Sequence, residues 1–320
     1  MRQAGRSLPE YRALRKQGSI LDAIKKPEVS TEITLQPIRR YGVDAAILYS
    51  DIVVPVHAVG FGVDIEPGVG PVAVNPFKSA DDLKRLPDLN PEKDTPYVLE
   101  TVKGCVEELE VPLIGFAGGP FTVASYLIEG GPSRSYQKTK ALMFGDSKLW
   151  GSLMERLTDI AIQSLLSQVN AGASAIQLFD SWAGALSPSQ YERFVFPYSE
   201  RVFSQLRSTG VPKIHFGVGT GELLTLMSDV GADVVGVDWR VPIDIARGRI
   251  GMGKAIQGNL DPALLGGSWD AIRLETLDIL NRIGSAPGHI FNLGHGVTPE
   301  VDPDVLLRVV DLVHDFRIET

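Results

Sequence analysis

Short apolar runs recur along the chain and predict β-strands. We expect strands at residues 44–50, 112–116, 173–180, 212–216, 233–238, 253–259 and 289–293. Nearly all of these runs are continuously apolar rather than alternating, which is typical of parallel strands that are buried on both faces.

Between these runs, apolar residues recur with the spacing of amphipathic helices. The helical pattern covers residues 10–17, 93–109, 147–173, 187–210, 220–232, 270–286 and 302–316. Three of these segments end in "NAGA", "DVGA" and "RSTGVP", where we expect the glycine to take the left-handed conformation that ends a helix. The alternation of strands and helices predicts an α/β fold with a parallel sheet, either doubly wound or closed as an eight-stranded barrel.

A closed barrel needs eight strands, and the pattern supplies seven. The missing strand would be the first, because the chain begins with "MRQAGR" where a first strand should be ending. Residues 51–90 and 117–140 are expected to be long loops at the carboxyl ends of strands, where barrel enzymes carry their chemistry. Since no repeat or linker divides the chain, we expect residues 1–320 to form a single domain.

Polar residues that follow the predicted strands are candidates for a functional site, because the carboxyl ends of parallel strands meet at one edge. These residues are Asp51, Asp180, Ser181, Gln257, Asn259, Asn292 and His295, and His215 falls inside a predicted strand. The alternative for each is a loop residue that caps a helix or shapes a turn, and for Asp51 and Ser181 both interpretations stay open.

Charge is distributed unevenly along the chain. The protein has 31 Lys and Arg against 39 Asp and Glu, a net charge of −8, which argues against a general nucleic-acid binder. Yet its first sixteen residues, "MRQAGRSLPEYRALRK", hold four arginines and a lysine. Arg2 and Arg6 would share one face of a helix, and an anionic ligand would explain their placement. A solvated helix start is the alternative.

Common cofactor and metal motifs are absent from the sequence. "GFAGGPFT" lacks the ending of a P-loop, and in "GVGTGE" Glu222 occupies the third glycine position of a dinucleotide-binding loop. Cys105 is the one cysteine, which leaves no multi-cysteine metal site. No apolar run approaches the length of a membrane span and no secretory signal pattern opens the chain, so we expect a cytoplasmic protein.

Seven stretches together resemble the uroporphyrinogen decarboxylase family over essentially the whole chain. They are "MRQAGRSLPEYR", "GFAGGPFTVASYLIEGG", "QLFDSWAGALSP", "HFGVGTGELL", "GVDWRVP", "QGNLDP" and "FNLGHGVTPEVDP". The resemblance implies a homodimeric (β/α)8 TIM barrel that works without a cofactor. It also implies the reaction, in which the four acetate carboxyls of uroporphyrinogen III leave as CO2 to give coproporphyrinogen III. A polyanionic tetrapyrrole as the small-molecule partner would account for the basic segment.

The resemblance also assigns roles to residues. Asp51 would accept the pyrrole N–H groups and stabilise the developing positive charge, with Arg2 and Tyr126 as further catalytic candidates. The residues expected to bind the substrate are Arg2, Gln3, Arg6, Asp51, Phe116, Tyr126, Phe179, Ser181 and His295. Family members carry a segment before "MRQAGR" with the body of the first barrel strand, so we expect that strand to be truncated here.

Two alternatives belong to other classes. A related barrel, the zinc-dependent methyltransferase that acts on corrinoid-bound methyl groups, uses a His-x-Cys pair, whereas this chain has His215, Phe216 and Gly217 in that stretch. A catalytically silent tetrapyrrole carrier would keep the binding residues without turnover.

Overall fold

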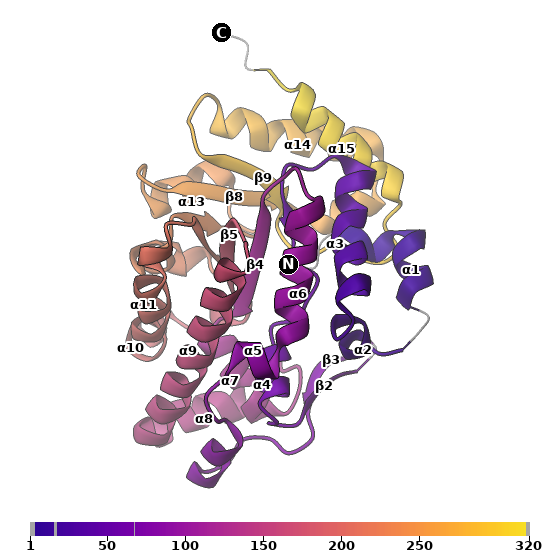
Figure 1. Cartoon of the computed structure of the whole chain (residues 1–320). Helices are drawn as coiled ribbons and strands as arrows, with labels where there is room; N and C mark the ends of the chain where they lie inside the picture. Colours follow the sequence, from indigo (N-terminus) through magenta and orange to yellow (C-terminus); the bar gives the residue numbers. More distant parts are fainter. Residues whose placement is uncertain (1–3, 16–17, 67, 318–320) are drawn as a thin grey trace.

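A curled sheet of parallel strands runs through the centre of the molecule (Figure 1). The structure is a computed structural model that describes residues 4–15, 18–66 and 68–317. Within these residues the sheet has seven strands, β1 (Ala46–Ile47), β4 (Leu113–Gly118), β5 (Ala175–Asp180), β6 (Lys213–Gly217), β7 (Val234–Gly236), β8 (Ala255–Leu260) and β9 (His289–Leu293). Each strand pairs in parallel with the next in this order, so the seven predicted strands are confirmed. The sheet forms a half-barrel whose outer strands, β1 and β9, show no pairing with each other in the described part of the chain.

Helices surround this sheet, with α3, α6, α9 and α11 packed side by side along its outer face (Figure 1). The first helices of the chain are α1 (Pro9–Arg15), α2 (Ile20–Ile24), α3 (Pro27–Tyr41), α4 (Val54–Ala58), α5 (Pro91–Asp94), α6 (Pro96–Glu108), α7 (Pro120–Glu129) and α8 (Gln137–Gly145). They are followed by α9 (Ser147–Asn170), α10 (Pro188–Phe194), α11 (Phe196–Gln205), α12 (Leu224–Asp229), α13 (Ile243–Ile250), α14 (Trp269–Ile283) and α15 (Pro303–Asp315). Short 3-10 turns are η1 (Ala4–Ser7), η2 (Ala80–Arg85), η3 (Ala183–Ala185), η4 (Arg207–Thr209), η5 (Gly221–Leu223) and η6 (Pro262–Gly266).

The predicted helix ends are confirmed at the three glycines. Gly172, Gly210 and Gly231 have φ angles of 119°, 72° and 98°, the left-handed region that glycine reaches without a Cβ clash. The prediction of one helix over 187–210 is wrong, because the segment divides into α10 and α11 at Val195. Pro197 at the start of α11 has no N–H to continue the helical hydrogen bonds, which explains the break.

Two segments predicted as loops carry regular structure. Residues 51–90 contain α4 and a two-stranded antiparallel hairpin of β2 (Val63–Glu66) and β3 (Gly70–Ala73). Residues 117–140 contain α7, which begins at Pro120, ends at Glu129 and is capped by Gly130, whose φ is 86°. Helices α3 and α13 were also missed by the sequence pattern, although α3 has the same signature of an initial proline and a final left-handed glycine.

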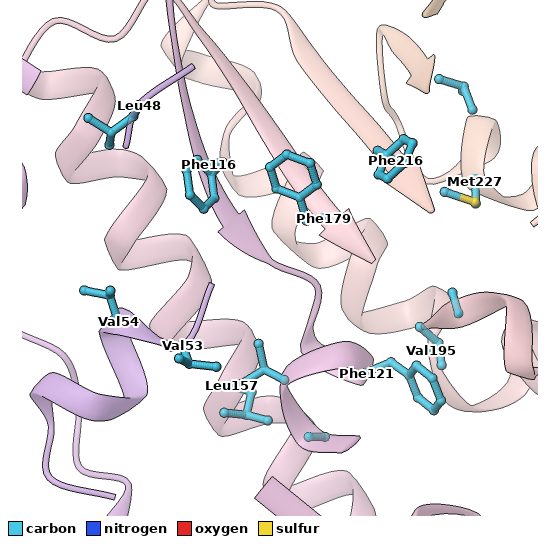
Figure 2. Packing of buried hydrophobic residues seen from close by; sticks show 14 of the residues in the cluster. Leu48, Val53, Val54, Phe116, Phe121, Leu157, Phe179, Val195, Phe216 and Met227 are labelled. Atoms are coloured by element: carbon cyan, nitrogen blue, oxygen red, sulfur yellow. The ribbon is translucent and has the colours of Figure 1, made fainter. Parts of the chain in front are cut away.

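The interior of the sheet is filled in layers. Ile114, Ile214 and Val234 form a cluster near the start of their strands. Further along the strands, Phe116, Phe179 and Phe216 lie on three neighbouring strands in edge-to-face contact, with ring centroids 5.2 Å and 5.9 Å apart (Figure 2). This aromatic layer closes the core at the carboxyl ends of the strands and forms the floor of the space above it.

Candidate active site

A cavity of about 500 Å³ opens at the carboxyl ends of the strands. Its wall combines segments that lie far apart in the sequence, namely Gly5, Tyr11, Ile20, Ile33, Pro37, 47–52, Pro71, Phe116, Tyr126, Phe179, Ser181, Trp182 and 295–299. The volume lies in the range of small-molecule sites, which bury most of a ligand against apolar walls with a few placed polar groups.

Most of the predicted site residues meet in this cavity. The six that line it are Asp51, Phe116, Tyr126, Phe179, Ser181 and His295. Arg2 and Gln3 lie outside the described residues, and the side chain of Arg6 is likewise not described. Arg6 follows Gly5 in η1, and Gly5 lines the cavity, so the backbone that carries Arg6 runs along the cavity wall.

Asp51 is a turn residue, as one of the two sequence interpretations has it, and it also lines the cavity. Its Oδ1 accepts a hydrogen bond from the Val53 N–H at 3.2 Å, and its carbonyl accepts from the Val54 N–H at 3.1 Å. The carboxylate therefore shapes the turn into α4 while it also lines the cavity. It is the one carboxylate among the described lining residues, in a wall that is otherwise largely apolar. A negative group in such surroundings interacts strongly with any positive charge that forms beside it.

Tyr126 reaches the cavity from the last turn of α7, where it meets an aromatic residue that was not predicted. The rings of Tyr126 and Trp182 have centroids 3.8 Å apart and planes tilted by 32°. Trp182 follows Ser181 directly after β5. The stretch "FDSWAG" therefore contributes three residues to the cavity wall, Phe179, Ser181 and Trp182. An aromatic side chain immediately after a strand's carboxyl end was the signal for Trp182 in the sequence.

His295 lies in the loop after β9. Burial lowers the pKa of its imidazole, Arg240 lowers it further, and Asp238 acts in the opposite direction. Near neutral pH the ring is therefore uncharged, with one N–H to donate. Asp238 is held by Arg240 and by the Gly219 N–H at 2.7 Å.

Two other candidate residues face away from the cavity. Asp180 follows the inward-facing Phe179, and His215 precedes the inward-facing Phe216. Because side chains alternate along a strand, Asp180 and His215 point toward the helices. Asp180 is fully buried, its Oδ1 accepts from the Thr122 hydroxyl at 2.7 Å, and burial raises the pKa of its carboxyl to about 6. His215 is also fully buried, with Nδ1 3.2 Å from the Met227 carbonyl, and burial lowers its pKa to about 4.

The strand-end amide of Asn259 supports a neighbouring loop and does not line the cavity. The Asn259 Nδ2 donates to the carbonyls of Asp238 at 2.9 Å and Val241 at 2.7 Å. These bonds fix the loop that carries Asp238 and Arg240. Asn259 therefore stabilises the loop after β7.

The described part of the basic N-terminal segment is bound to backbone carbonyls. Arg12 donates to the carbonyl of Pro299 in the cavity wall, and Arg15 Nη1 donates to the carbonyl of Ser19 at 2.6 Å. Arg12 thus ties α1 to the loop after β9. For direct anion binding, Arg2 and Arg6 stay the candidates that the sequence predicts.

The glycines of "GFAGGPFT" serve packing. A Cβ built on Gly118 would lie 2.5 Å from Val123 Cγ2, and one on Gly119 would lie 2.7 Å from Asp180 Cγ. Close approach of β4 to α7 explains Gly118, and close approach of the turn before α7 to β5 explains Gly119, without a phosphate ligand.

Metal-binding residues do not gather in the described ranges. No group of three or more His, Cys, Asp or Glu side chains there could hold a metal ion. Cys105 is buried in α6, where burial raises its thiol pKa to about 11, and His215 points away from the cavity. The pair that a corrinoid methyltransferase would need is thus not assembled by these residues. Across the described helices, none is long and apolar enough to cross a membrane.

Comparisons with known proteins agree with this geometry. A family model described as "Uroporphyrinogen decarboxylase (URO-D)" matches residues 1–316. Proteins named uroporphyrinogen decarboxylase from Salinispora tropica and Streptomyces avermitilis are 59% and 58% identical to this chain. These matches cover 99% and 98% of this chain, and 85% and 88% of those proteins.

Solved structures with the same fold are more distant in sequence. A methyltransferase from Methanosarcina mazei has a TM-score of 0.75 at 22% identity, covering 92% of this chain and 87% of that one. A B12-independent methionine synthase from Shewanella has a TM-score of 0.61 at 13% identity, covering 92% and 88% of the two chains. At these identities the likeness shows the fold alone.

Proposed function

Because this chain belongs to the uroporphyrinogen decarboxylase family, with its TIM-barrel-like fold and its decarboxylation in porphyrin biosynthesis, we propose that the cavity at the strand ends is where uroporphyrinogen binds and reacts. In this reaction the four acetate groups of uroporphyrinogen III lose CO2 and become the methyl groups of coproporphyrinogen III. The observation that supports the location is the convergence of Asp51, Tyr126, Ser181 and His295, from four separate segments, on one cavity.

The chemistry needs a place for the electron pair of the breaking bond. Protonation of a pyrrole ring carbon gives an iminium-like cation, and the bond between the acetate methylene and its carboxyl can then break. Its electron pair moves into the ring system, CO2 leaves, and a second proton on the methylene gives the methyl group while the ring returns its own. The substrate itself is the electron sink, so the protein's task is to hold charges and protons in place.

Asp51 is proposed to stabilise the cationic intermediate. Its carboxylate would accept the pyrrole N–H groups, and the apolar surroundings strengthen its interaction with the positive charge. Phe116 and Phe179, already in edge-to-face contact, would offer an apolar floor to the macrocycle. Arg2 is the candidate for the acid or for the partner of the leaving carboxyl. A guanidinium is a poor acid at neutral pH, which favours the second of these roles.

Substrate carboxylates are proposed to be bound at the rim. Tyr126, Ser181 and His295 each carry a donor, and the neutral imidazole of His295 can donate one N–H. Arg6, which follows Gly5 of the cavity wall, and Gln3 would bind further side-chain carboxylates. Each charge-assisted bond of this kind contributes about 1.5–3 kcal/mol, so a few of them suffice to orient the ring.

The domain, assembly and location remain proposals of the same kind. A single domain is supported by one hydrophobic cluster that extends from Leu8 to Val309. A homodimer and a cytoplasmic location are inferred from the family resemblance and the sequence. Sedimentation that shows only a monomer would contradict the dimer.

Activity can be tested with the purified protein and chemically reduced uroporphyrinogen III. Products separated by their number of carboxyl groups should pass from eight to four as the reaction proceeds. Substrate that is bound but unchanged would instead identify a tetrapyrrole carrier. Corrinoid-dependent methyl transfer that requires tightly bound zinc would favour the methyltransferase alternative.

A further inference from the structure

Trp182 makes the closest aromatic contact in the cavity, and nothing in the family resemblance gives it a role. We propose that Trp182 is a positioning residue that fixes the orientation of Tyr126, and that a buried hydrogen-bond chain from Asp180 through Thr122 holds it there. This proposal rests on the proposed role of Tyr126 in the decarboxylation.

The contact between the two rings is direct. Their centroids lie 3.8 Å apart with planes tilted by 32°, and both side chains line the cavity. A ring packed this closely blocks the rotation that would carry the Tyr126 side chain away from its position. The direction of the Tyr126 hydroxyl therefore depends on where Trp182 stands.

The backbone of Trp182 is tied to the same helix that carries Tyr126. The Trp182 N–H donates to Thr122 Oγ1 at 3.2 Å, and the Thr122 hydroxyl donates to Asp180 Oδ1 at 2.7 Å. Thr122 and Tyr126 are four residues apart on α7 and so lie on one face of it. Trp182 is thus held at two points by α7, through its backbone and through its ring.

The hydrogen-bond chain has a defined direction because it ends at the carboxyl group of Asp180. Both Thr122 and Asp180 are fully buried, and the single hydroxyl proton of Thr122 is given to the carboxyl. This leaves the oxygen lone pairs of Thr122 for the Trp182 N–H. At Gly119 a Cβ would lie 2.7 Å from Asp180 Cγ, so the turn into α7 packs tightly on this carboxyl.

A third aromatic residue, immediately before α8, supports Trp182. Tyr136 has φ 52° and ψ 35°, a left-handed conformation that a tyrosine rarely adopts, and its N–H donates to Ser133 Oγ at 3.0 Å. In this conformation its ring meets Trp182 edge-on, with centroids 5.2 Å apart. Lys140 Nζ donates to the carbonyl of Ala185 at 2.6 Å and ties α8 to the loop after Trp182. Strained backbone that places a side chain is typical of functional sites.

A double-mutant cycle on turnover tests the proposal. Trp182→Leu should lower kcat by roughly tenfold when Tyr126 is present and by less than about twofold in a Tyr126→Phe background. Trp182→Phe, which keeps an aromatic ring, should retain most of kcat. Equal losses in the two backgrounds would overturn the proposal, because they would show that Trp182 acts independently of the Tyr126 hydroxyl. If Tyr126→Phe alone is fully active, the proposed role of Tyr126 fails instead.

A matched pair at Thr122 tests the hydrogen-bond chain. Thr122→Ser keeps the hydroxyl and should keep kcat, whereas Thr122→Val keeps the shape and should lower kcat as Trp182→Leu does. A thermal unfolding curve of each variant gives the fraction that is folded at the assay temperature. The role of the hydrogen-bond chain would be contradicted if the loss of kcat in Thr122→Val were unchanged in the Tyr126→Phe background, or if Thr122→Ser showed the same loss.

Discussion

The Asp51 carboxylate accepts a 3.2 Å hydrogen bond from the Val53 N–H while it lines the cavity above the aromatic layer. The bond to Val53 needs only an acceptor oxygen, which an amide supplies as well as a carboxylate. The proposed catalytic role needs the negative charge. A single substitution can therefore separate the turn contact of Asp51 from its proposed catalytic role.

Asp51→Asn should lower kcat by roughly 10²–10³-fold, the effect of removing one preorganised electrostatic group. Thermal unfolding should stay close to that of the unmodified protein, because the side-chain amide oxygen can still cap the turn. Asp311→Asn, at an exposed position on α15, is the control and should leave turnover unchanged. Retention of most activity in Asp51→Asn would remove Asp51 from the mechanism.

Arg6→Ala should act mainly on substrate binding. Loss of one charge-assisted bond to a substrate carboxylate predicts a rise in KM of roughly 10–100-fold with a smaller effect on kcat. Steady-state kinetics measure both constants, and Arg273→Ala on the exposed face of α14 is the matched control. An unchanged KM for the Arg6 variant would count against an anion site in this segment.

Asp180 should make the stability of the protein depend on pH. Burial raises the pKa of the folded carboxyl to about 6, above the ordinary value of about 4 for the unfolded chain. Its contribution to stability is then full below about pH 4 and is lost as pH rises through about 6. Asp180→Asn escapes this loss, so its free energy of unfolding relative to the unmodified protein should rise by about 2–3 kcal/mol between pH 4 and 7.5. Urea unfolding at the two pH values measures the difference, and an equal difference at both would show that Asp180 does not titrate in this way.

Gly119→Ala tests the close packing of the turn into α7. The new Cβ would lie 2.7 Å from Asp180 Cγ, and relieving that clash should cost about 1–3 kcal/mol of unfolding free energy. Gly145→Ala is the control, since a Cβ at the end of α8 meets nothing within 4 Å. Chemical denaturation should show a loss for the first variant and none for the second. Equal stabilities would mean that the turn can shift freely.

Much of the fold could be predicted because the sheet is buried on both faces. Runs such as residues 173–180 are continuously apolar, and this marks them as strands even without knowledge of their partners. The same property hid which face each residue takes, so Asp180 and the inward-facing Phe179 looked equally placed for the site. The β2–β3 hairpin was missed because its alternating stretches are short and are interrupted by proline and glycine. The alternation of Val63, Asp64 and Ile65 was nevertheless visible.

The site was predicted where a residue follows a strand or matches a family motif. Asp51, Ser181 and His295 are of this kind, and the structure brings them to one cavity. The contact between Tyr126 and Trp182 could not be predicted, because it depends on how α7 packs against the loop after β5. The same holds for Arg12, whose bond to the carbonyl of Pro299 joins opposite ends of the chain.

The central claim is that the Asp51 carboxylate binds the pyrrole nitrogens at the middle of the macrocycle. A crystal structure of the protein with coproporphyrinogen III bound under reducing conditions tests it most directly. The account predicts Asp51 oxygens at roughly 2.7–3.2 Å from pyrrole nitrogens, with the ring resting on Phe116 and Phe179. A macrocycle bound with the Asp51 side chain turned away from its nitrogens would contradict the account.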